Sequence, residues 1–402
     1  MKALNDLLTL DCLPRDWREA TLVGRAWLPG TPAGPSPVAL RPGGEVVDLA
    51  AVEPTMSQLL ARSDRVAITH AAPGAVIGQV EALLANSGDG RNAAMPSLLA
   101  PIDLQPIKAS GVTFVQSLLE RVIEEQARGD TARAEAIRVQ VTRIIGDNLA
   151  TVKPGSREAE EIKRVLVAQG AWSQYLEVGI GPDAEIFTKA PVMSAVGPGA
   201  EVGLHPKSSW NNPEPEIVLA VTAAGETIGA TLGNDVNLRD FEGRSALLLG
   251  KSKDNNASCA IGPFIRLFDE HFGIEDVRRA ELALEIAGTD GFALEGSSPM
   301  SKISRDPLDI VTHAWGAHHQ YPDGFVLFLG TMFAPVKDRG APGMGFTHKP
   351  GDLVSISTPK LGRLVNRVTT SDQARPWTFG IGALMRNLAA RGLLRQGYNP
   401  PN

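Results

Sequence analysis

The sequence predicts a strand-rich α+β fold, and three observations support this prediction. Glycine and proline are abundant, at 41 and 29 of 402 residues, and both interrupt regular elements. From about residue 177 to about residue 370, short β-prone runs alternate with turn residues. Helical periodicity is confined to a few stretches, chiefly 113–150 and 157–169. These features argue against a helix bundle.

The first 105 residues are expected to form a small strand-rich N-terminal domain, followed by a larger domain over 106–402. Thr21–Leu28 has the composition of a strand. The tripeptide Pro42-Gly43-Gly44 separates two β-prone runs and predicts a hairpin. A short helix is expected after Pro54, and a linker is expected at Pro101–Pro106.

Three helical stretches are expected outside this N-terminal segment. Residues 113–150 carry an apolar stripe interleaved with charges and are broken at Gly129-Asp130. A second helix is expected over 157–169, with Ser156 as its N-cap and Gly170 at its end. Gly380–Arg395 is expected to form the last helix, with a basic C-terminal turn.

Charge and cysteine content restrict the classes of partner and compartment. Lysine and arginine total 39 against 45 acidic residues, for a net charge of −6, which does not favour a nucleic-acid partner. No window approaches the roughly 18 apolar residues of a membrane span. Asp6 and Asp11 interrupt the apolar N-terminal stretch and argue against a secretory signal. Two distant cysteines, Cys12 and Cys259, are expected to be free thiols, so a cytoplasmic protein is predicted.

The most informative segment is a predicted hairpin over Asn212–Glu242. Glu214 and Glu216 are two residues apart, so on a strand they share a face. A two-residue turn at Ala224-Gly225 would place Asp235 directly opposite Glu214. Three carboxylates on one face repel each other unless a cation lies between them, and oxygen ligands favour Mg²⁺, Mn²⁺ or Ca²⁺. The alternative is an exposed acidic hairpin whose carboxylates face water.

The chain contains the motifs Glu214-Pro-Glu216, Gly233-Asn-Asp235-Val-Asn-Leu-Arg239-Asp240, Gly250-Lys251, Cys259-Ala-Ile-Gly262-Pro263, Thr188–Gly199, Leu329-Gly330-Thr331 and Lys349–Asn366. Together these motifs resemble the core of the fumarylacetoacetate hydrolase superfamily, from about residue 108 to about residue 370. The resemblance implies a mixed β-sandwich roll that commonly assembles as dimers or multiples of dimers. It also implies that 106–402 is the catalytic domain and that Glu214, Glu216 and Asp235 hold a divalent ion, usually Mg²⁺.

One departure from the hydrolytic members narrows the expected activity. They carry a His-x-x-Glu pair before this region, and the matching positions here are Ser117 and Glu120. A neutral hydroxyl cannot replace histidine as the general base near neutral pH. The stretch from Ala109 to Glu125 and the N-terminal unit instead resemble the sugar-acid dehydratase branch. That branch implies Mg²⁺-dependent dehydration of 2-keto-3-deoxy-D-pentonate to 2-oxoglutarate semialdehyde. An acylpyruvate-type C–C hydrolase, or a decarboxylase or isomerase on the same fold, is the alternative.

The resemblance also suggests roles for further residues. Glu120 is expected to accept the C3 proton, and Lys251 to assist departure of the C4 hydroxyl, with Lys253 as the competing assignment. Arg239 either ties the hairpin to neighbouring carboxylates or reaches the substrate. Substrate contacts are also expected from Lys189 and Thr331, and Ser297 and Ser298 either line the site or form a loop turn.

Overall fold

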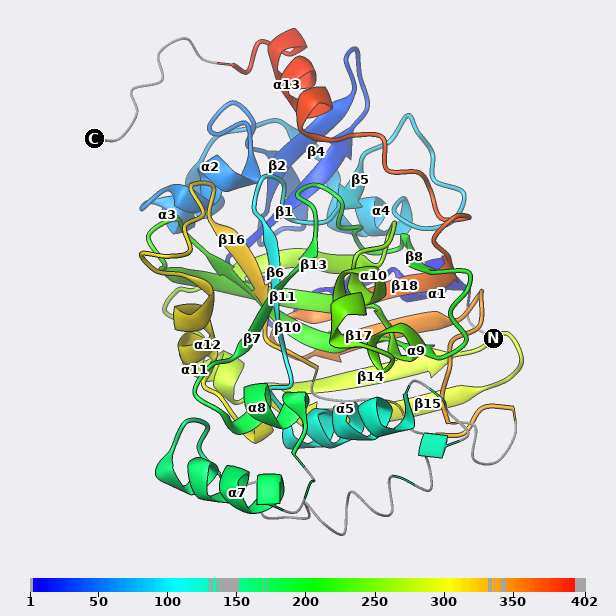
Figure 1. Cartoon of the computed structure of the whole chain (residues 1–402). Coiled ribbons are helices and arrows are strands. Elements are labelled where there is room, and N and C mark those ends of the chain that lie inside the picture. The colour runs from blue at the N-terminus through cyan, green and yellow to red at the C-terminus, as the bar shows by residue number, and fades with distance from the viewer. Residues whose placement is uncertain are drawn as a thin grey trace.

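The computed structural model describes the backbone of most of the chain. The described residues are 3–128, 130, 133–134, 137, 152–168, 170, 172–331, 335, 337–340 and 345–394, without the side chains of 115–117. Figure 1 shows sheets at the centre of the molecule and helices around them.

An eleven-stranded sheet dominates the fold, with the order β4-β3-β2-β1-β13-β11-β10-β16-β6-β7 and with β5 paired to β1. Neighbouring strands are antiparallel except for β16 and β6, which are parallel. The strands are β1 (Leu22–Leu28), β2 (Gly34–Leu40), β3 (Glu45–Asp48), β4 (Val76–Gln79), β5 (Ser97–Leu99), β6 (Ile107–Gly111), β7 (Glu185–Ala190), β10 (Pro215–Val221), β11 (Thr227–Asp235), β13 (Cys259–Leu267) and β16 (Phe325–Phe328).

A second sheet packs against the central part of the first. Its order is β15-β14-β17-β18-β8, and a two-stranded ribbon joins β9 to β12. Leu219 of β10 belongs to the same buried apolar cluster as Leu284 and Ile356 of the second sheet, so the two sheets form a sandwich. The strands are β8 (Glu201–Leu204), β9 (Asn211–Asn212), β12 (Asn237–Leu238), β14 (Glu281–Ala287), β15 (Ala293–Pro299), β17 (Leu353–Thr358) and β18 (Gly362–Thr370).

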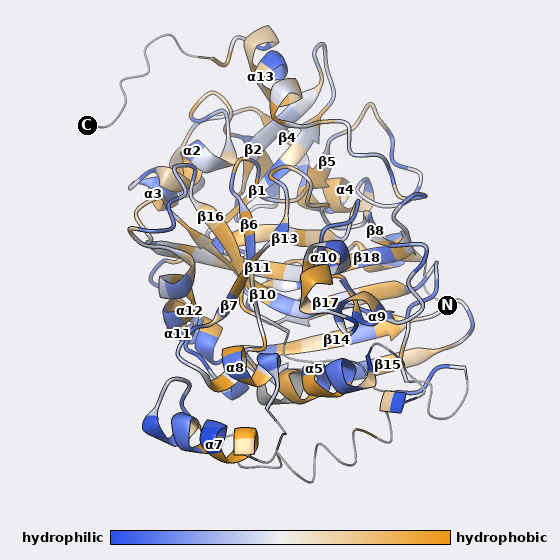
Figure 2. Cartoon of the chain, viewed as in Figure 1, coloured by the Kyte–Doolittle hydropathy of each residue, from blue (hydrophilic) through white to orange (hydrophobic). Residues whose placement is uncertain are grey.

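Helices surround the sheets, and their outer faces are more polar than the central strands (Figure 2). In the described part of the chain, no helix is long and apolar enough to cross a membrane. Short 3₁₀ helices occur at Leu10–Cys12, Ala246–Leu248 and Met300–Lys302. The α-helices are α1 (Leu4–Leu7), α2 (Met56–Ala61), α3 (Arg65–Ala71), α4 (Val80–Ala85), α5 (Val115–Ala127), α7 (Arg157–Ala168), α8 (Gln174–Ile180), α9 (Arg239–Glu242), α10 (Leu249–Lys253), α11 (Ile274–Arg278), α12 (Pro307–Ala314) and α13 (Ile381–Ala390).

Most of the elements expected from the sequence are present. The predicted hairpin is β2 and β3, and the predicted helices correspond to α2, α5, α7 and α13. Helix α5 ends at Ala127, because Arg128 adopts a left-handed conformation with φ of 53°. Residues 138–150 of the expected helical region lie outside the described residues. Cys12 and Cys259 are buried free thiols, as expected.

The division of the chain at residue 105 remains a prediction. Strand β1 of the N-terminal segment pairs with β13, with Leu22 opposite Arg266. Strands from both sides of the proposed boundary therefore belong to one hydrogen-bonded sheet. If residues 1–105 are a separate folding unit, its sheet continues into the sheet of the larger domain through the pairing of β1 with β13.

Candidate metal and active site

The hairpin that carries the candidate ligands has the predicted register, although its turn differs from the prediction. Pro215 lies opposite Asn234 and Glu216 opposite Gly233, and the Asp235 N–H donates to the Glu214 carbonyl at 3.0 Å. The turn has three residues instead of two, because the Thr222 N–H donates to the Glu226 carbonyl. A bulge between Ala220 and Val221, at Ile228 of the partner strand, adds one residue to β11 and restores the register.

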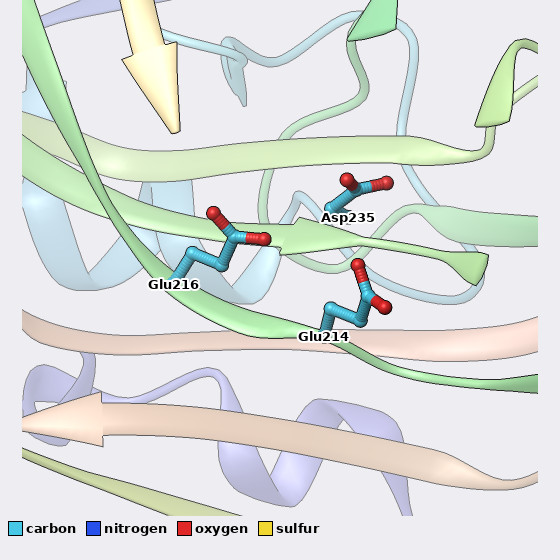
Figure 3. Close-up of side chains that lie close together, drawn as sticks. All are labelled: Glu214, Glu216 and Asp235. Atoms are coloured by element: carbon cyan, nitrogen blue, oxygen red, sulfur yellow. The ribbon is translucent and has the colours of Figure 1, made fainter. Parts of the chain in front are cut away.

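This register brings three carboxylates together at one end of the hairpin (Figure 3). Glu214, Glu216 and Asp235 each offer an oxygen, and these oxygens lie within 4.8 Å of one another. All three side chains are at most 3% exposed, so the exposed acidic hairpin considered as the alternative is wrong. The Gly330 N–H donates to Glu216 Oε2 at 2.6 Å. Gly330 has a φ of +95°, which favours glycine.

Two buried lysines contact the three carboxylates. Lys189 Nζ lies 2.8 Å from Asp235 Oδ1. Lys253 Nζ lies 2.5 Å from Glu214 Oε2 and 3.0 Å from Asp235 Oδ2. Burial opposes the charged form of Lys253, but Asp235 and Glu214 raise its pKa above the usual range. Neither lysine forms an ion pair with Glu216.

A second layer of charges lies between α5 and α9. Arg121 contacts Glu124 at 2.7 Å, Glu242 at 2.9 Å and also Glu214. Arg239 donates to Glu124 at 2.6 Å and to Glu120 at 2.9 Å, and its guanidinium stacks on Trp210. Arg239 thus ties the metal hairpin region to the carboxylates of α5, which was one of its two predicted roles.

The charges of these residues do not balance. Among the described residues of this cluster, six carboxylates and four cationic groups are buried. When all six carboxylates are ionised, the cluster has a formal excess of two negative charges. Burial, Asp235 and Glu214 all raise the pKa of Glu216 well above its usual range. One divalent cation bound by the three hairpin carboxylates would supply the missing charge. The residues are Glu120, Glu124, Glu214, Glu216, Asp235 and Glu242, against Arg121, Lys189, Arg239 and Lys253.

Glu185 differs from the other carboxylates at the site. It borders the same small cavity as Glu214 and Asp235 and has no hydrogen bond or ion pair to any residue that the structure describes. Burial raises its pKa, and Arg121 and Lys253 partly oppose that rise. A Cβ on Gly111 of the adjacent strand would lie 1.9 Å from Glu185 Oε2. Glycine at position 111 therefore leaves room for this carboxylate.

The structure brings some of the remaining predicted residues to the site and leaves others away from it. Thr331 lines the two small cavities beside the carboxylates, one of which Glu120 also lines. Lys251 does not reach the carboxylates, because positions 251 and 253 lie on opposite sides of α10 and only Lys253 is buried. Ser297 is exposed and donates to Glu281 at 2.9 Å, and neither Ser297 nor Ser298 lines these cavities.

Two residues of the site, Arg121 and Glu185, were not identified from the sequence, and a third, Lys253, was ranked behind Lys251. Lys253 was the competing assignment to Lys251, and the buried face of α10 decides between them. Arg121 and Glu185 have no motif of their own. Arg121 follows Glu120 directly, and Glu185 lies four residues before Lys189 on the same strand, so adjacency to predicted residues was the only available signal. The side chain of Ser117 lies outside the described residues.

Comparisons with known proteins agree with this geometry. The family model described as "Fumarylacetoacetate (FAA) hydrolase C-terminal" matches residues 167–369. A probable 2-keto-3-deoxyxylonate dehydratase of Haloferax volcanii is 30% identical over 196 residues, which cover 49% of this chain and 64% of that protein. A 2-dehydro-3-deoxy-D-arabinonate dehydratase of Saccharolobus solfataricus is 31% identical over 184 residues, which cover 46% of this chain and 58% of that protein. The matches thus span less than two thirds of each relative.

Solved structures show the same fold. A 2-keto-3-deoxy-D-arabinonate dehydratase, complexed with magnesium and 2,5-dioxopentanoate, aligns over 87% of this chain and 99% of its own, with a TM-score of 0.61 and 21% identity. A fumarylacetoacetate hydrolase of Exiguobacterium antarcticum aligns over 87% of this chain and all of its own, with a TM-score of 0.51 and 16% identity. The family model covers about half of the chain and includes the whole carboxylate hairpin. The chain therefore belongs to the fumarylacetoacetate hydrolase family.

Proposed function

We propose that the chain is a hydro-lyase that dehydrates 2-keto-3-deoxy-D-pentonate to 2-oxoglutarate semialdehyde with a bound divalent cation, normally Mg²⁺. The observation that carries the proposal is the buried group of three close carboxylates, Glu214, Glu216 and Asp235, in a cluster with a formal excess of two negative charges. A buried excess of this size is costly unless a cation is bound. Oxygen ligands alone select a hard ion such as Mg²⁺, Mn²⁺ or Ca²⁺.

The relatives support the substrate class. Both curated relatives are named as dehydratases of 2-keto-3-deoxy pentonates, and the magnesium complex contains 2,5-dioxopentanoate, which is 2-oxoglutarate semialdehyde under another name. When bound, the cation would supply Lewis-acid polarisation of a keto group. This chemistry acidifies the C3 protons of a 2-keto acid, which is the first requirement for loss of the C4 hydroxyl.

Glu185 is our candidate for the transfer of the C3 proton. The sequence assigned this step to Glu120, but Glu120 accepts a hydrogen bond from Arg239 at 2.9 Å, and an ion-paired carboxylate is a weak base. Glu185 borders the same cavity without such a partner among the described residues. A carboxylate with a raised pKa can take up a proton nearer neutral pH.

Lys253 and Thr331 complete the proposed set. The ammonium of Lys253 borders the cavity and can donate to the departing C4 hydroxyl, the role that the sequence gave to Lys251. The hydroxyl of Thr331 is our candidate for binding the substrate carboxylate, since Thr331 lines both small cavities. Lys189 contacts Asp235 and Arg239 contacts α5, so we assign both residues to positioning the site.

The experiment that tests this proposal is a product assay. The protein is incubated with Mg²⁺ and 2-keto-3-deoxy-D-pentonate, and 2-oxoglutarate semialdehyde is measured, with a chelator in a parallel sample. We expect product only with the metal present, and a loss of about 100-fold in Glu185→Gln with Mg²⁺ affinity retained. Release of pyruvate from an acylpyruvate without any dehydration would instead establish the hydrolase alternative.

The homo-oligomeric state, the cytoplasmic location and a place in pentose catabolism remain proposals. They rest on the resemblance and the composition described above, and no residue contact in the single chain bears on them. Mass photometry of the purified protein would measure the oligomeric state, and a dimer or a multiple of dimers is expected.

A further inference from the structure

A second cavity, of about 530 Å³, lies away from the metal site. Its lining residues come mainly from β1 and β5, from the segment 193–201 and from the segment 375–379, which precedes α13. No residue lines both this cavity and the two small cavities beside the carboxylates. The proposed dehydration therefore makes no use of this cavity, whose volume is that of a typical small-molecule site.

Two arginines in its wall lack a counter-charge. Arg91 and Arg375 both line the cavity, and neither side chain has a hydrogen bond or ion pair to a residue in the described part of the chain. Arg91 is half-buried and Arg375 is exposed at the edge of the same cavity. Burial lowers the pKa of Arg91, and the charge of Arg375 lowers it further. Adjacent guanidinium groups repel each other, and an anion between them would relieve that repulsion.

The other walls supply contacts of two further kinds. Trp27 and Phe379 pack edge to face, with centroids 5.2 Å apart, and the 47% exposed side chain of Trp377 lies beside them. Aromatic walls favour a flat ring. Glu201 also lines the cavity and has no ion pair with a described residue. A carboxylate of this kind can accept hydrogen bonds from hydroxyl groups.

The third arginine of the cavity, Arg25, already has partners within the chain. Arg25 is buried and donates to the Ile102 carbonyl at 3.0 Å, and Asp103 partly offsets the lowering of its pKa by burial. Arg91 and Arg375 are therefore the two arginines of the cavity whose side chains have no hydrogen bond or ion pair to a described residue. Two guanidinium forks match the several oxygens and the double charge of a phosphate monoester better than those of a single carboxylate.

From this arrangement we infer that the cavity binds a nucleoside monophosphate or a closely similar phosphate monoester. Arg91 and Arg375 hold the phosphate, the aromatic wall of Trp27, Trp377 and Phe379 takes the ring, and Glu201 accepts hydrogen bonds from sugar hydroxyls. The inference is independent of the proposed dehydration, because it concerns other residues.

The test is a titration of the full-length protein with adenosine monophosphate. Binding is followed by calorimetry and by the fluorescence of Trp27 and Trp377. We expect adenosine monophosphate to bind more tightly than either adenosine or inorganic phosphate alone. Each of Arg91→Ala and Arg375→Ala should weaken binding about tenfold or more. Neither change removes a contact to a described residue, so we expect both variants to fold.

A matched control separates this site from general charge effects. Arg279, with a 71% exposed side chain, does not line the cavity, so Arg279→Ala should bind as the unaltered protein does. Failure of adenosine monophosphate to bind would overturn the inference. If adenosine bound as tightly as adenosine monophosphate, the arginines would have no role and the inference would also be overturned. If inorganic phosphate bound as tightly, the aromatic wall would have no role, with the same consequence.

Discussion

Two clusters of charge around buried carboxylates differ in whether their charges balance. Around Asp352, Arg339 donates to both carboxylate oxygens at 2.6 and 2.8 Å and also to Asp290, which Lys349 contacts at 2.8 Å. Two acids thus meet two bases, and burial lowers the pKa of His348 beside them, which keeps its ring neutral. The ten buried groups around Glu214, Glu216 and Asp235 have a formal excess of two negative charges.

The difference indicates what each cluster does. A balanced network needs no bound ion and stabilises the fold, here by linking Arg339 and Asp352 to the loop at Asp290. An unbalanced buried cluster is costly by itself and becomes favourable only with a bound ion. Arg91 and Arg375 of the second cavity differ from both clusters, because Arg91 is half-buried, Arg375 is exposed, and neither side chain has an ion pair with a described residue. Substitutions in the unbalanced cluster should therefore affect metal binding and activity, whereas substitutions in the balanced network should affect the stability of the fold.

The largest expected effect is at the unbalanced cluster. Glu216→Gln keeps the shape of the side chain but removes a ligand charge, so Mg²⁺ affinity and dehydratase activity should both fall, the activity by about a thousandfold or more. The fold should be retained, because Glu216 has no ion pair with a basic residue. Glu270→Gln, with an 85% exposed side chain, is the matched control. Full activity in Glu216→Gln would contradict the metal assignment.

The balanced network should show the reverse pattern. Arg339→Met leaves the buried Asp352 without its bidentate partner, so we expect a loss of about 3 kcal/mol in the free energy of unfolding. Mg²⁺ affinity of the folded protein should not change. Denaturant unfolding and metal titration measure the two quantities separately, and a weakened Mg²⁺ affinity with unchanged stability would reverse our distinction between the clusters.

A smaller effect is expected at the two lysines of α10. Lys253→Met should lower activity by about 100-fold, because it removes the ammonium that borders the cavity. Lys251→Met should leave activity unchanged, because Lys251 is exposed and contacts no carboxylate in the described part of the chain. Steady-state kinetics of the two variants measure both activities, and each variant serves as the control for the other. Equal losses in both would show that the exposed lysine also acts in catalysis.

The sequence predicted the metal hairpin better than it predicted the residues around it. The predicted register is correct because the extra residue in the turn and the bulge before Gly229 shift the pairing in opposite directions and compensate each other. The periodicity of the sequence indicates neither the longer turn nor the bulge. The choice between Lys251 and Lys253 depends on which face of a five-residue helix is buried, which tertiary packing decides. Glu185 and Arg121 reach the site through strand pairing and α5 packing, so no local pattern marks them.

The last prediction separates the clusters by pH. The pKa of Glu216 is raised in the folded protein above its unfolded value of about 4.3. The metal-free native state therefore keeps a proton that the unfolded chain has lost, and the stability of the metal-free protein falls as pH rises above that unfolded value. For Asp352, burial raises the pKa, but Arg339 and His348 more than offset this effect, so the folded pKa is lowered.

Asp352 therefore contributes stability that is fully present above its unfolded pKa of about 3.9 and is lost as pH falls through the lower folded value. Between pH 5 and 8, by contrast, the stabilisation by Mg²⁺ should increase with pH, since ionised Glu216 binds the cation and protonated Glu216 does not. Thermal unfolding is measured at each pH with excess Mg²⁺ and with excess chelator, and the difference in stability between the two samples is the stabilisation by Mg²⁺. The titration of His348 affects both samples equally and cancels in this difference. Each pKa unit of the upward shift is worth about 1.4 kcal/mol. A Mg²⁺ effect that does not vary with pH, or the same dependence in Glu216→Gln, would show that Glu216 does not bind the ion.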